Sequence, residues 1–168
     1  NSKLFEDMQK LAMGTVEALA RAVDAKSKWT SGHSERVAVL GGRIAKVMGL
    51  SEKEIDTMTR GGLLHDIGKI GIRLSILDKP DRLTEEEYSE VKNHPAIGAK
   101  ILEPIKVYQD VLPLVLHHHE KYDGTGYPDG LKGEEIDIRA RALAVADVWD
   151  ALISDRPYRE GWVQDRAK

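Results

Sequence analysis

The apolar residues of this chain recur at helical spacing along almost its whole length. Two runs show this most clearly: Leu4, Met8, Leu11, Thr15, Leu19 and Val23, followed by His33, Val37, Leu40, Ile44 and Val47. Intervals of three and four residues place side chains on one face of a helix, whereas a half-buried strand alternates every two residues. No segment shows that alternation convincingly, and no internal repeat is present. The sequence therefore predicts an all-α fold.

Short local signals mark where the helices begin and end. Capping boxes start at Ser51 and Thr84, each with a glutamate three residues later. Pro95 and Pro113 favour fresh helix starts, because the residue before a proline is pushed out of the helical region. Residues 123–130 hold three glycines and a proline and are expected to form a loop. A last helix is expected over residues 138–153.

The length and composition limit the possible classes of protein. At 168 residues the chain is long enough for one domain with a real core. We expect residues 1–30 to form an amphipathic N-terminal helix, as a linker or as the first helix of the domain. Residues 31–168 are expected to form the domain itself. A formal net charge of −3 argues against direct binding of a nucleic-acid polymer.

The chain has no cysteine, so disulfides and thiolate metal sites are excluded. No apolar run approaches the roughly 18 residues that a membrane span needs, and no signal peptide opens the chain. These features predict a cytoplasmic location, either alone or as the cytoplasmic domain of a larger, even membrane-anchored, protein.

Five of the six histidines fall at predicted helix ends or on predicted buried faces. They are His33, His65, His94, His118 and His119. His117 is rotated away from the face set by Leu114 and Val115, and we expect it to be a structural or surface residue. Any one such histidine is more often an ordinary core or surface residue, but the five together are typical of a metal centre.

Two acidic residues belong to the same predicted faces. Asp147 lies within Ala-Val-Ala-Asp-Val-Trp, where an unpaired carboxylate would cost several kcal/mol. A salt bridge to Arg139 or Arg141 is the plain alternative to a metal. Asp66 follows His65, and the doublet is equally compatible with a capped helix end. A carboxylate can bridge two metals, whereas an imidazole nitrogen binds one, so Asp66 is the natural bridge.

His65-Asp66-Ile-Gly-Lys69, together with His118-His119-Glu120-x-x-Asp123-Gly-x-Gly126-Tyr127-Pro128, resembles the HD-GYP family. This family is a branch of the HD-domain metal-dependent phosphohydrolases. Further matches follow in the family's order: His33-Ser-x-Arg36, Asn93-His94-Pro95, Asp147-x-x-Asp150 and Asp155-Arg-Pro-Tyr-Arg159. The resemblance runs from about residue 20 to the C-terminus. It implies an HD-domain helical bundle with an HD-GYP loop that hydrolyses cyclic di-GMP, with two divalent metals, iron or manganese.

The resemblance also implies roles for individual residues. His33, His65, Asp66 and Asp147 would hold one metal, and Asp66, His94, His118 and His119 the other. Asp66 and Lys69 would be catalytic, with Lys69 on the scissile phosphate. Tyr127 and Pro128 would form a wall beside the substrate. Arg156 and Arg159 would contact its phosphates or guanines.

The chain departs from the family at two points. Members of a three-metal type carry a glutamate four residues before the first histidine, where this chain has Trp29. Since an indole cannot ligate, we expect two metals and the linear dinucleotide as the main product. A carboxylate at that position would face the site if the helix of His33 extended back through it. The domain also ends earlier than usual, and a C-terminal helical segment is expected to be missing.

Three functional readings remain open at this stage. The first is hydrolysis of cyclic di-GMP, and the second is action on cyclic GMP-AMP or another nucleotide. The third is a non-catalytic sensor or docking module that keeps the metal site for binding. The long first helix suggests an upstream sensory domain or a homodimer as further partners.

Overall fold

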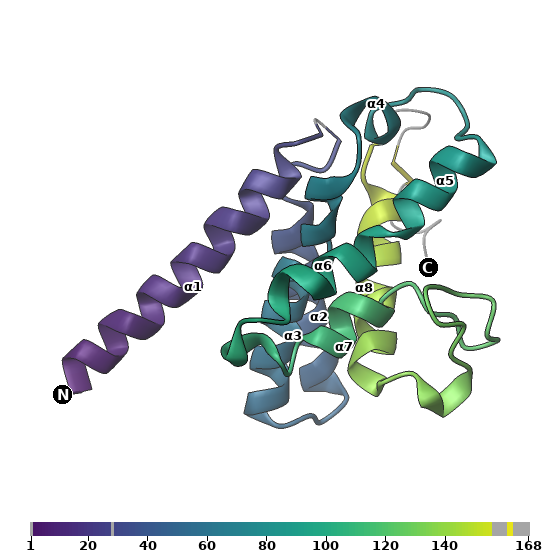
Figure 1. Ribbon diagram of the computed structural model, residues 1–168. Helices are drawn as coiled ribbons and strands as arrows, with labels where there is room; N and C mark the ends of the chain where they lie inside the picture. Colours follow the sequence, from purple (N-terminus) through teal and green to yellow (C-terminus); the bar gives the residue numbers. More distant parts are fainter. Residues whose placement is uncertain (1, 28, 156–160, 163–168) are drawn as a thin grey trace.

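The computed structural model describes residues 2–27, 29–155, 161 and 162, and its secondary structure is wholly helical (Figure 1). The α-helices are α1 (Ser2–Asp24), α2 (His33–Val47), α3 (Glu52–Leu64), α4 (Leu74–Leu77), α5 (Glu85–Lys92), α6 (His94–Leu102), α7 (Leu112–His117) and α8 (Ile138–Ile153). Three 3₁₀ turns are η1 (Ile67–Gly71), η2 (Lys106–Tyr108) and η3 (Gly133–Glu135). No strand occurs in these residues, so the all-α prediction is confirmed.

The predicted helix boundaries agree closely with the structure. The Ser51 hydroxyl accepts a hydrogen bond from the backbone of Glu54, whose carboxylate accepts one in return from the backbone of Ser51. Thr84 and Glu87 form the same reciprocal pair at the start of α5. Each capping box pairs backbone N–H groups that the first turn of a helix leaves without partners.

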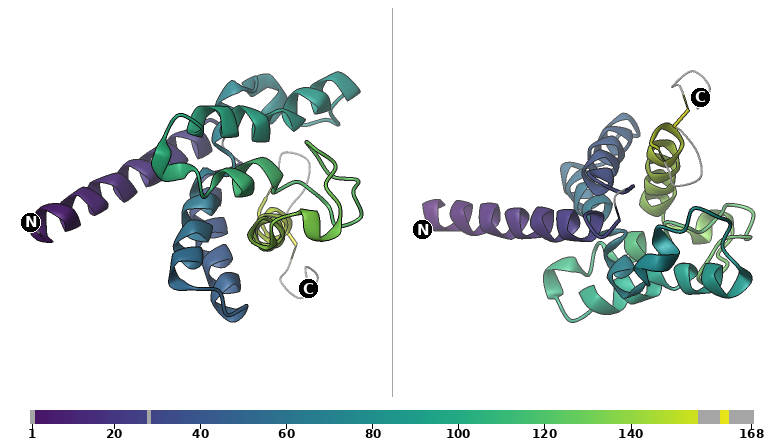
Figure 2. Two further views of the ribbon diagram at one scale, coloured as in Figure 1. Left: turned by 60° about the horizontal axis from the view of Figure 1, so that its bottom comes forward. Right: turned by 90° about the horizontal axis from the view of Figure 1, so that it is seen from above.

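Helices α2 and α3 pack side by side, with α8 against α2 and with α6 and α7 beside them (Figures 1 and 2). Met58, Leu114 and Leu143 are fully buried and join α3, α7 and α8 in one core cluster. The approach of α3 to α2 is close, because a β-carbon on Gly62 would lie 2.5 Å from the Cα of Ala38. This packing brings the ends of several helices to one region.

Helix α1 projects from the rest of the molecule, and only its C-terminal half contacts the other helices (Figure 2). Most of the apolar residues that recur at helical spacing in this helix do not face the other helices. Leu4, Met8 and Leu11 are 65, 61 and 72% exposed, while Val16 and Ala20 are buried with Val23. Tertiary contacts selected a different apolar face, since α1 carries apolar residues around much of its circumference. No helix among the described residues has the length and apolarity to cross a membrane.

Candidate metal centre

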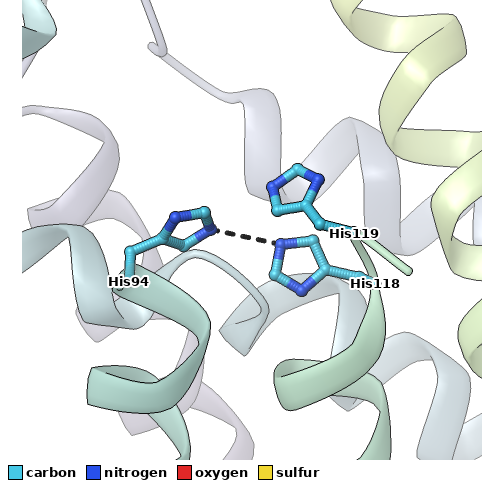
Figure 3. Close-up of side chains that lie close together, drawn as sticks. All are labelled: His94, His118 and His119. Atoms are coloured by element: carbon cyan, nitrogen blue, oxygen red, sulfur yellow. Dashed lines mark hydrogen bonds between the residues drawn. The ribbon is translucent and has the colours of Figure 1, made fainter. Parts of the chain in front are cut away.

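Seven side chains meet where the ends of α2, α3, α6 and α7 approach the middle of α8. They are His33, His65, Asp66, His94, His118, His119 and Asp147, which are all of the predicted metal ligands. Their nitrogen and oxygen atoms form three groups, each within 4.8 Å: His94 with His118 and His119, His33 with His65 and Asp66, and His65 with His118 and Asp147. All but His119 are at most 8% exposed. Figure 3 shows the first group.

Three of the histidines follow the end of a helix and cap it. The Nδ1 atoms of His65, His94 and His118 lie 2.7, 2.7 and 2.9 Å from the carbonyl oxygen three residues earlier. Those carbonyls belong to the last turns of α3, α5 and α7, which leave them without helical partners. A carbonyl oxygen can only accept, so each Nδ1 carries the proton. Each Nε2 therefore presents a lone pair to the centre.

His33 is oriented by a carboxylate instead. Its Nδ1 lies 2.7 Å from Oδ2 of Asp150, which also receives a hydrogen bond from Arg36. Its Nε2 lies 3.2 Å from Oδ1 of Asp147. Asp150 follows Asp147 by one turn of α8. Asp150 is a functional residue that the sequence motif contained without indicating its role, although the three-residue interval on a buried helix could have indicated one.

The two oxygens of Asp66 face different histidines. Oδ1 lies 3.2 Å from Nε2 of His94, whereas Oδ2 lies 3.4 Å from Nε2 of His65 and 3.6 Å from that of His33. This is the arrangement of a carboxylate that can bridge two cations. Burial raises the pKa of Asp66, but Lys69 and the neighbouring histidines outweigh it and lower that pKa well below its usual value.

Burial keeps three of the imidazoles neutral. It lowers the pKa of His65, lowers that of His118 well below the ordinary value, and lowers that of His119 to about 4. Burial would also lower the pKa of His33, but hydrogen bonds to Asp147 and Asp150 raise it to about 9. A proton and a metal ion therefore compete for Nε2 of His33.

The donor set fits divalent cations. Nε2 of His65 is buried and has no hydrogen-bond partner among the described residues. Nε2 of His94 and Nε2 of His118 lie 3.3 Å apart (Figure 3). Both rings already donate from Nδ1, so a hydrogen bond between these atoms needs an extra proton on one ring. A divalent cation would instead partner both lone pairs, and imidazole with carboxylate is a ligand set that such ions accept.

The plain alternative for Asp147, a salt bridge to an arginine of α8, is not what the structure shows. Arg139 pairs with Asp137 at 2.6 Å, and Arg141 lies over the ring of Tyr122. Asp147 faces His33 and His65 instead. Burial would raise its pKa, but the hydrogen bond from His33 and the other nearby imidazoles lower that pKa below the usual value.

Lys69 lies between this centre and a large cavity. Its Nζ is 2.5 Å from Oδ2 of Asp66, and its side chain also lines a cavity of about 810 Å³. Trp29, Tyr88 and Arg82 line the same cavity. Trp29 does not continue the helix of His33, because α2 begins at His33 after Gly32 in the left-handed conformation (φ 68°). The idea of a helix extending back through Trp29 is therefore wrong.

The predicted loop carries Tyr127 to the edge of the centre. The ring of Tyr127 lies 4.8 Å from that of His119, and Pro128 follows it. Glu120 is buried and holds this loop by accepting hydrogen bonds from the backbone of Asp129 and Gly130 at 2.7 and 3.0 Å. This role of Glu120 is not evident from its place in the sequence motif.

Two further predictions concern residues elsewhere. His117 lies outside the group of seven, with Nε2 3.0 Å from Asp129. Arg156 and Arg159, the predicted contacts to the substrate, lie outside the described residues.

The chain is similar to several known proteins. The family model described as HD domain matches residues 17–167. The cyclic di-GMP phosphodiesterase response regulator RpfG of Xanthomonas campestris is 46% identical over 165 residues, covering 97% of this chain and 44% of that protein. The 3'3'-cGAMP-specific phosphodiesterase 3 of Vibrio cholerae is 44% identical over 152 residues, covering 90% and 33%.

A solved structure is similar over the same region. Bd1817, described as an HDG"Y"P protein from Bdellovibrio bacteriovorus, superposes with a TM-score of 0.65 at 28% identity, covering 80% of this chain and 44% of that one. The chain spans less than half the length of these curated relatives.

Proposed function

Because the chain belongs to the HD domain family, in agreement with its HD-GYP motifs, we propose that it is a metal-dependent phosphodiesterase of bacterial second-messenger signalling. Its proposed substrate is cyclic di-GMP and its main product the linear dinucleotide. The convergence of five histidines and two aspartates beside a large cavity carries this proposal. The names of relatives at 46 and 40% identity support the choice of cyclic di-GMP.

We propose two divalent ions, iron or manganese, held on either side of Asp66. His33, His65 and Asp147 would complete one site, and His94, His118 and His119 the other. Such ions, when bound, stabilise negative charge on phosphoryl oxygens as Lewis acids. The rings of His65, His94 and His118 are held by hydrogen bonds at Nδ1 before any ion binds, and the pKa values of Asp66 and Asp147 are lowered, so both carboxyl groups are ionised.

Lys69 is a cationic residue that the protein places beside the proposed metal centre. Its side chain lines the cavity and its Nζ contacts Asp66, so a phosphate bound in the cavity next to Lys69 would meet a cation beside the centre. Water adds to phosphorus, one bond to a ribose oxygen breaks, and that oxygen takes a proton. Charge that grows on the phosphate oxygens during this step would be stabilised by the ammonium group.

The cavity suits a ligand of two nucleotides. Its volume of about 810 Å³ is within the range of small-molecule sites. Trp29 and Tyr88 offer aromatic faces to the bases. Lys69 and Arg82 bring positive charge to the lining, Lys79 is paired with Glu87, and Asp81 and Glu85 line the same cavity. Burial raises the pKa of Tyr127, so its phenol remains a hydrogen-bond donor beside His119.

The decisive experiment is hydrolysis by a preparation whose metal content is known. The protein is incubated separately with cyclic di-GMP and with 3'3'-cGAMP, and the products are separated by chromatography over time. We expect faster conversion of cyclic di-GMP, ending mainly at the linear dinucleotide. Faster turnover of the mixed dinucleotide would replace the proposed substrate. Binding without product, in protein loaded with metal, would identify a non-catalytic sensor.

A further inference from the structure

The side chain of Lys26 reaches across to the segment that carries Lys69. Lys26 lies just after the end of α1, and its Nζ donates to the carbonyl oxygens of Lys69 at 2.9 Å, of Ile70 at 2.8 Å and of Ile72. An ammonium group has three donor hydrogens and no acceptor. The three carbonyls therefore use its full capacity, and Lys26 is committed to backbone contacts.

These carbonyls surround the C-terminal end of η1, the 3₁₀ turn over Ile67–Gly71. The last carbonyls of a helical turn have no partner within the turn, and a positive charge is favourable there. Lys26 meets both needs at one point. Without it, the Ile70 and Ile72 carbonyls would lose the side-chain partner that the structure gives them.

Helix α6 also holds η1. A β-carbon on Gly68 would lie 1.9 Å from the carbonyl oxygen of His94, so the two backbones are in direct contact. Lys69 is the next residue. Its backbone thus follows a residue packed directly against α6 and accepts a hydrogen bond from the Lys26 ammonium, and its side chain reaches Asp66 from that position.

The segment of Lys26 is itself anchored. Asp24 accepts hydrogen bonds from the backbone N–H and the hydroxyl of Ser34, at 3.0 and 2.8 Å, beside His33. The Ser27 hydroxyl donates to Asp78 at 2.5 Å. Lys26 therefore extends from a turn that is tied to α2 on one side and to the end of α4 on the other. It is placed to hold η1 still.

We propose that Lys26 is a positioning residue for Lys69. By capping η1, it sets the place of the Lys69 ammonium at the border between the metal centre and the cavity. This inference rests on the role proposed above for Lys69 in phosphodiester hydrolysis. Lys26 itself contacts backbone oxygens and has no part in holding metal or substrate.

A first measurement needs no activity. In the full chain, Lys26→Met should increase amide hydrogen exchange in peptides that cover residues 67–72. Exchange in α8 and the metal content should stay as in the wild type. Lys46→Met, at an exposed lysine of α2, serves as the matched control and should change neither region. Unchanged exchange over 67–72 in Lys26→Met would overturn the proposed contact.

The second measurement is a double-mutant cycle. Lys26→Met should lower kcat for cyclic di-GMP by about 10-fold or more with little change in KM, because a small displacement of a charged group is costly. Lys26→Arg should recover part of the loss. In a Lys69→Ala background, the same Lys26→Met change should alter kcat by less than about 2-fold. Independent, multiplicative losses would mean that Lys26 does not act through Lys69.

The two proposals fail in different ways. If the wild type loaded with metal leaves cyclic di-GMP intact, the proposed function falls, while the exchange data still decide whether Lys26 holds η1. If the wild type is active and Lys26→Met has the same kcat, the positioning role is wrong and the proposed function stands.

Discussion

Asp66 occupies a position that no other member of the centre shares. Its Oδ1 faces His94 and its Oδ2 faces His65. Oδ2 also accepts a hydrogen bond from the Lys69 ammonium group. In the two proposed metal sites, removing one of the histidines takes a donor from one site only. Removing Asp66 takes one from both, and it also leaves Lys69 without its anionic partner.

We therefore predict that Asp66→Ala abolishes hydrolysis and loses more bound metal than any other single ligand substitution. The reason is the loss of a shared, charged donor from both proposed sites. Elemental analysis of purified variants, compared with His94→Ala and His33→Ala, measures this directly. Two full metal equivalents in Asp66→Ala would contradict the bridging assignment.

Lys69 should behave differently, since it contacts Asp66 but cannot donate a lone pair while protonated. We predict that Lys69→Ala keeps nearly normal metal content and loses on the order of 10²-fold or more in rate. Steady-state kinetics and elemental analysis on the same preparation separate these effects. Loss of the metals, or a wild-type rate, would show that the assigned role is wrong.

At the scale of the helices, the close contact of α2 with α3 sets the distance between His33 and His65. Gly62 permits this contact, because a β-carbon there would lie 2.5 Å from backbone at Ala38. We predict that Gly62→Ala lowers the free energy of unfolding by ~1–3 kcal/mol, which is the usual cost of overpacking. Urea denaturation monitored by circular dichroism measures the loss.

Gly14 offers a matched control within α1. A β-carbon there would meet nothing within 4 Å, so Gly14→Ala should stabilise the helix by up to ~1 kcal/mol. Equal stability of the two variants would show that the α2–α3 contact is less rigid than the backbone distance implies.

Helix α5 brings Tyr88 to the cavity, and its start is fixed by the Thr84 capping box. If Tyr88 stacks on a base, Tyr88→Ala should raise KM by about 5-fold or more, since stacking on aromatic residues contributes ~1–3 kcal/mol per base. Tyr88→Phe should retain the wild-type KM. Kinetics on both variants test this, and equal KM for wild type and Tyr88→Ala would remove Tyr88 from the binding site.

For the molecule as a whole, the candidate centre ties five segments together. Its members come from α2, the end of α3, the start of α6, the end of α7, and α8. We predict that Mn²⁺ at about 100 times its dissociation constant stabilises the folded state by ~2.7 kcal/mol, through binding to that state alone. Thermal unfolding with manganese and with a chelator measures the shift. An identical Tm in both would argue against a shared metal centre.

The helical class, most helix boundaries and the set of converging histidines and aspartates follow from the amino-acid sequence alone. Helical periodicity, the capping boxes at Ser51 and Thr84, and the glycine-rich loop over 123–130 all depend on contacts within about four residues. Such contacts can be predicted from residues that lie close together in the sequence. The motifs that resemble the HD-GYP family then gave a residue-by-residue expectation, and the structure brings all seven predicted ligands together.

The buried face of α1, the position of Trp29 and the side chains that orient the site depend instead on how the helices pack. Asp150 bonds to His33 across 117 positions, and Lys26 reaches Lys69 across 43. Nothing in the local sequence pairs residues so far apart, because their contact depends on how completed helices pack. In α1, Leu4 and Val16 are similar in apolarity, yet Val16 is buried and Leu4 is exposed. The difference arises because α2, α3 and η1 contact only the part of α1 that carries Val16.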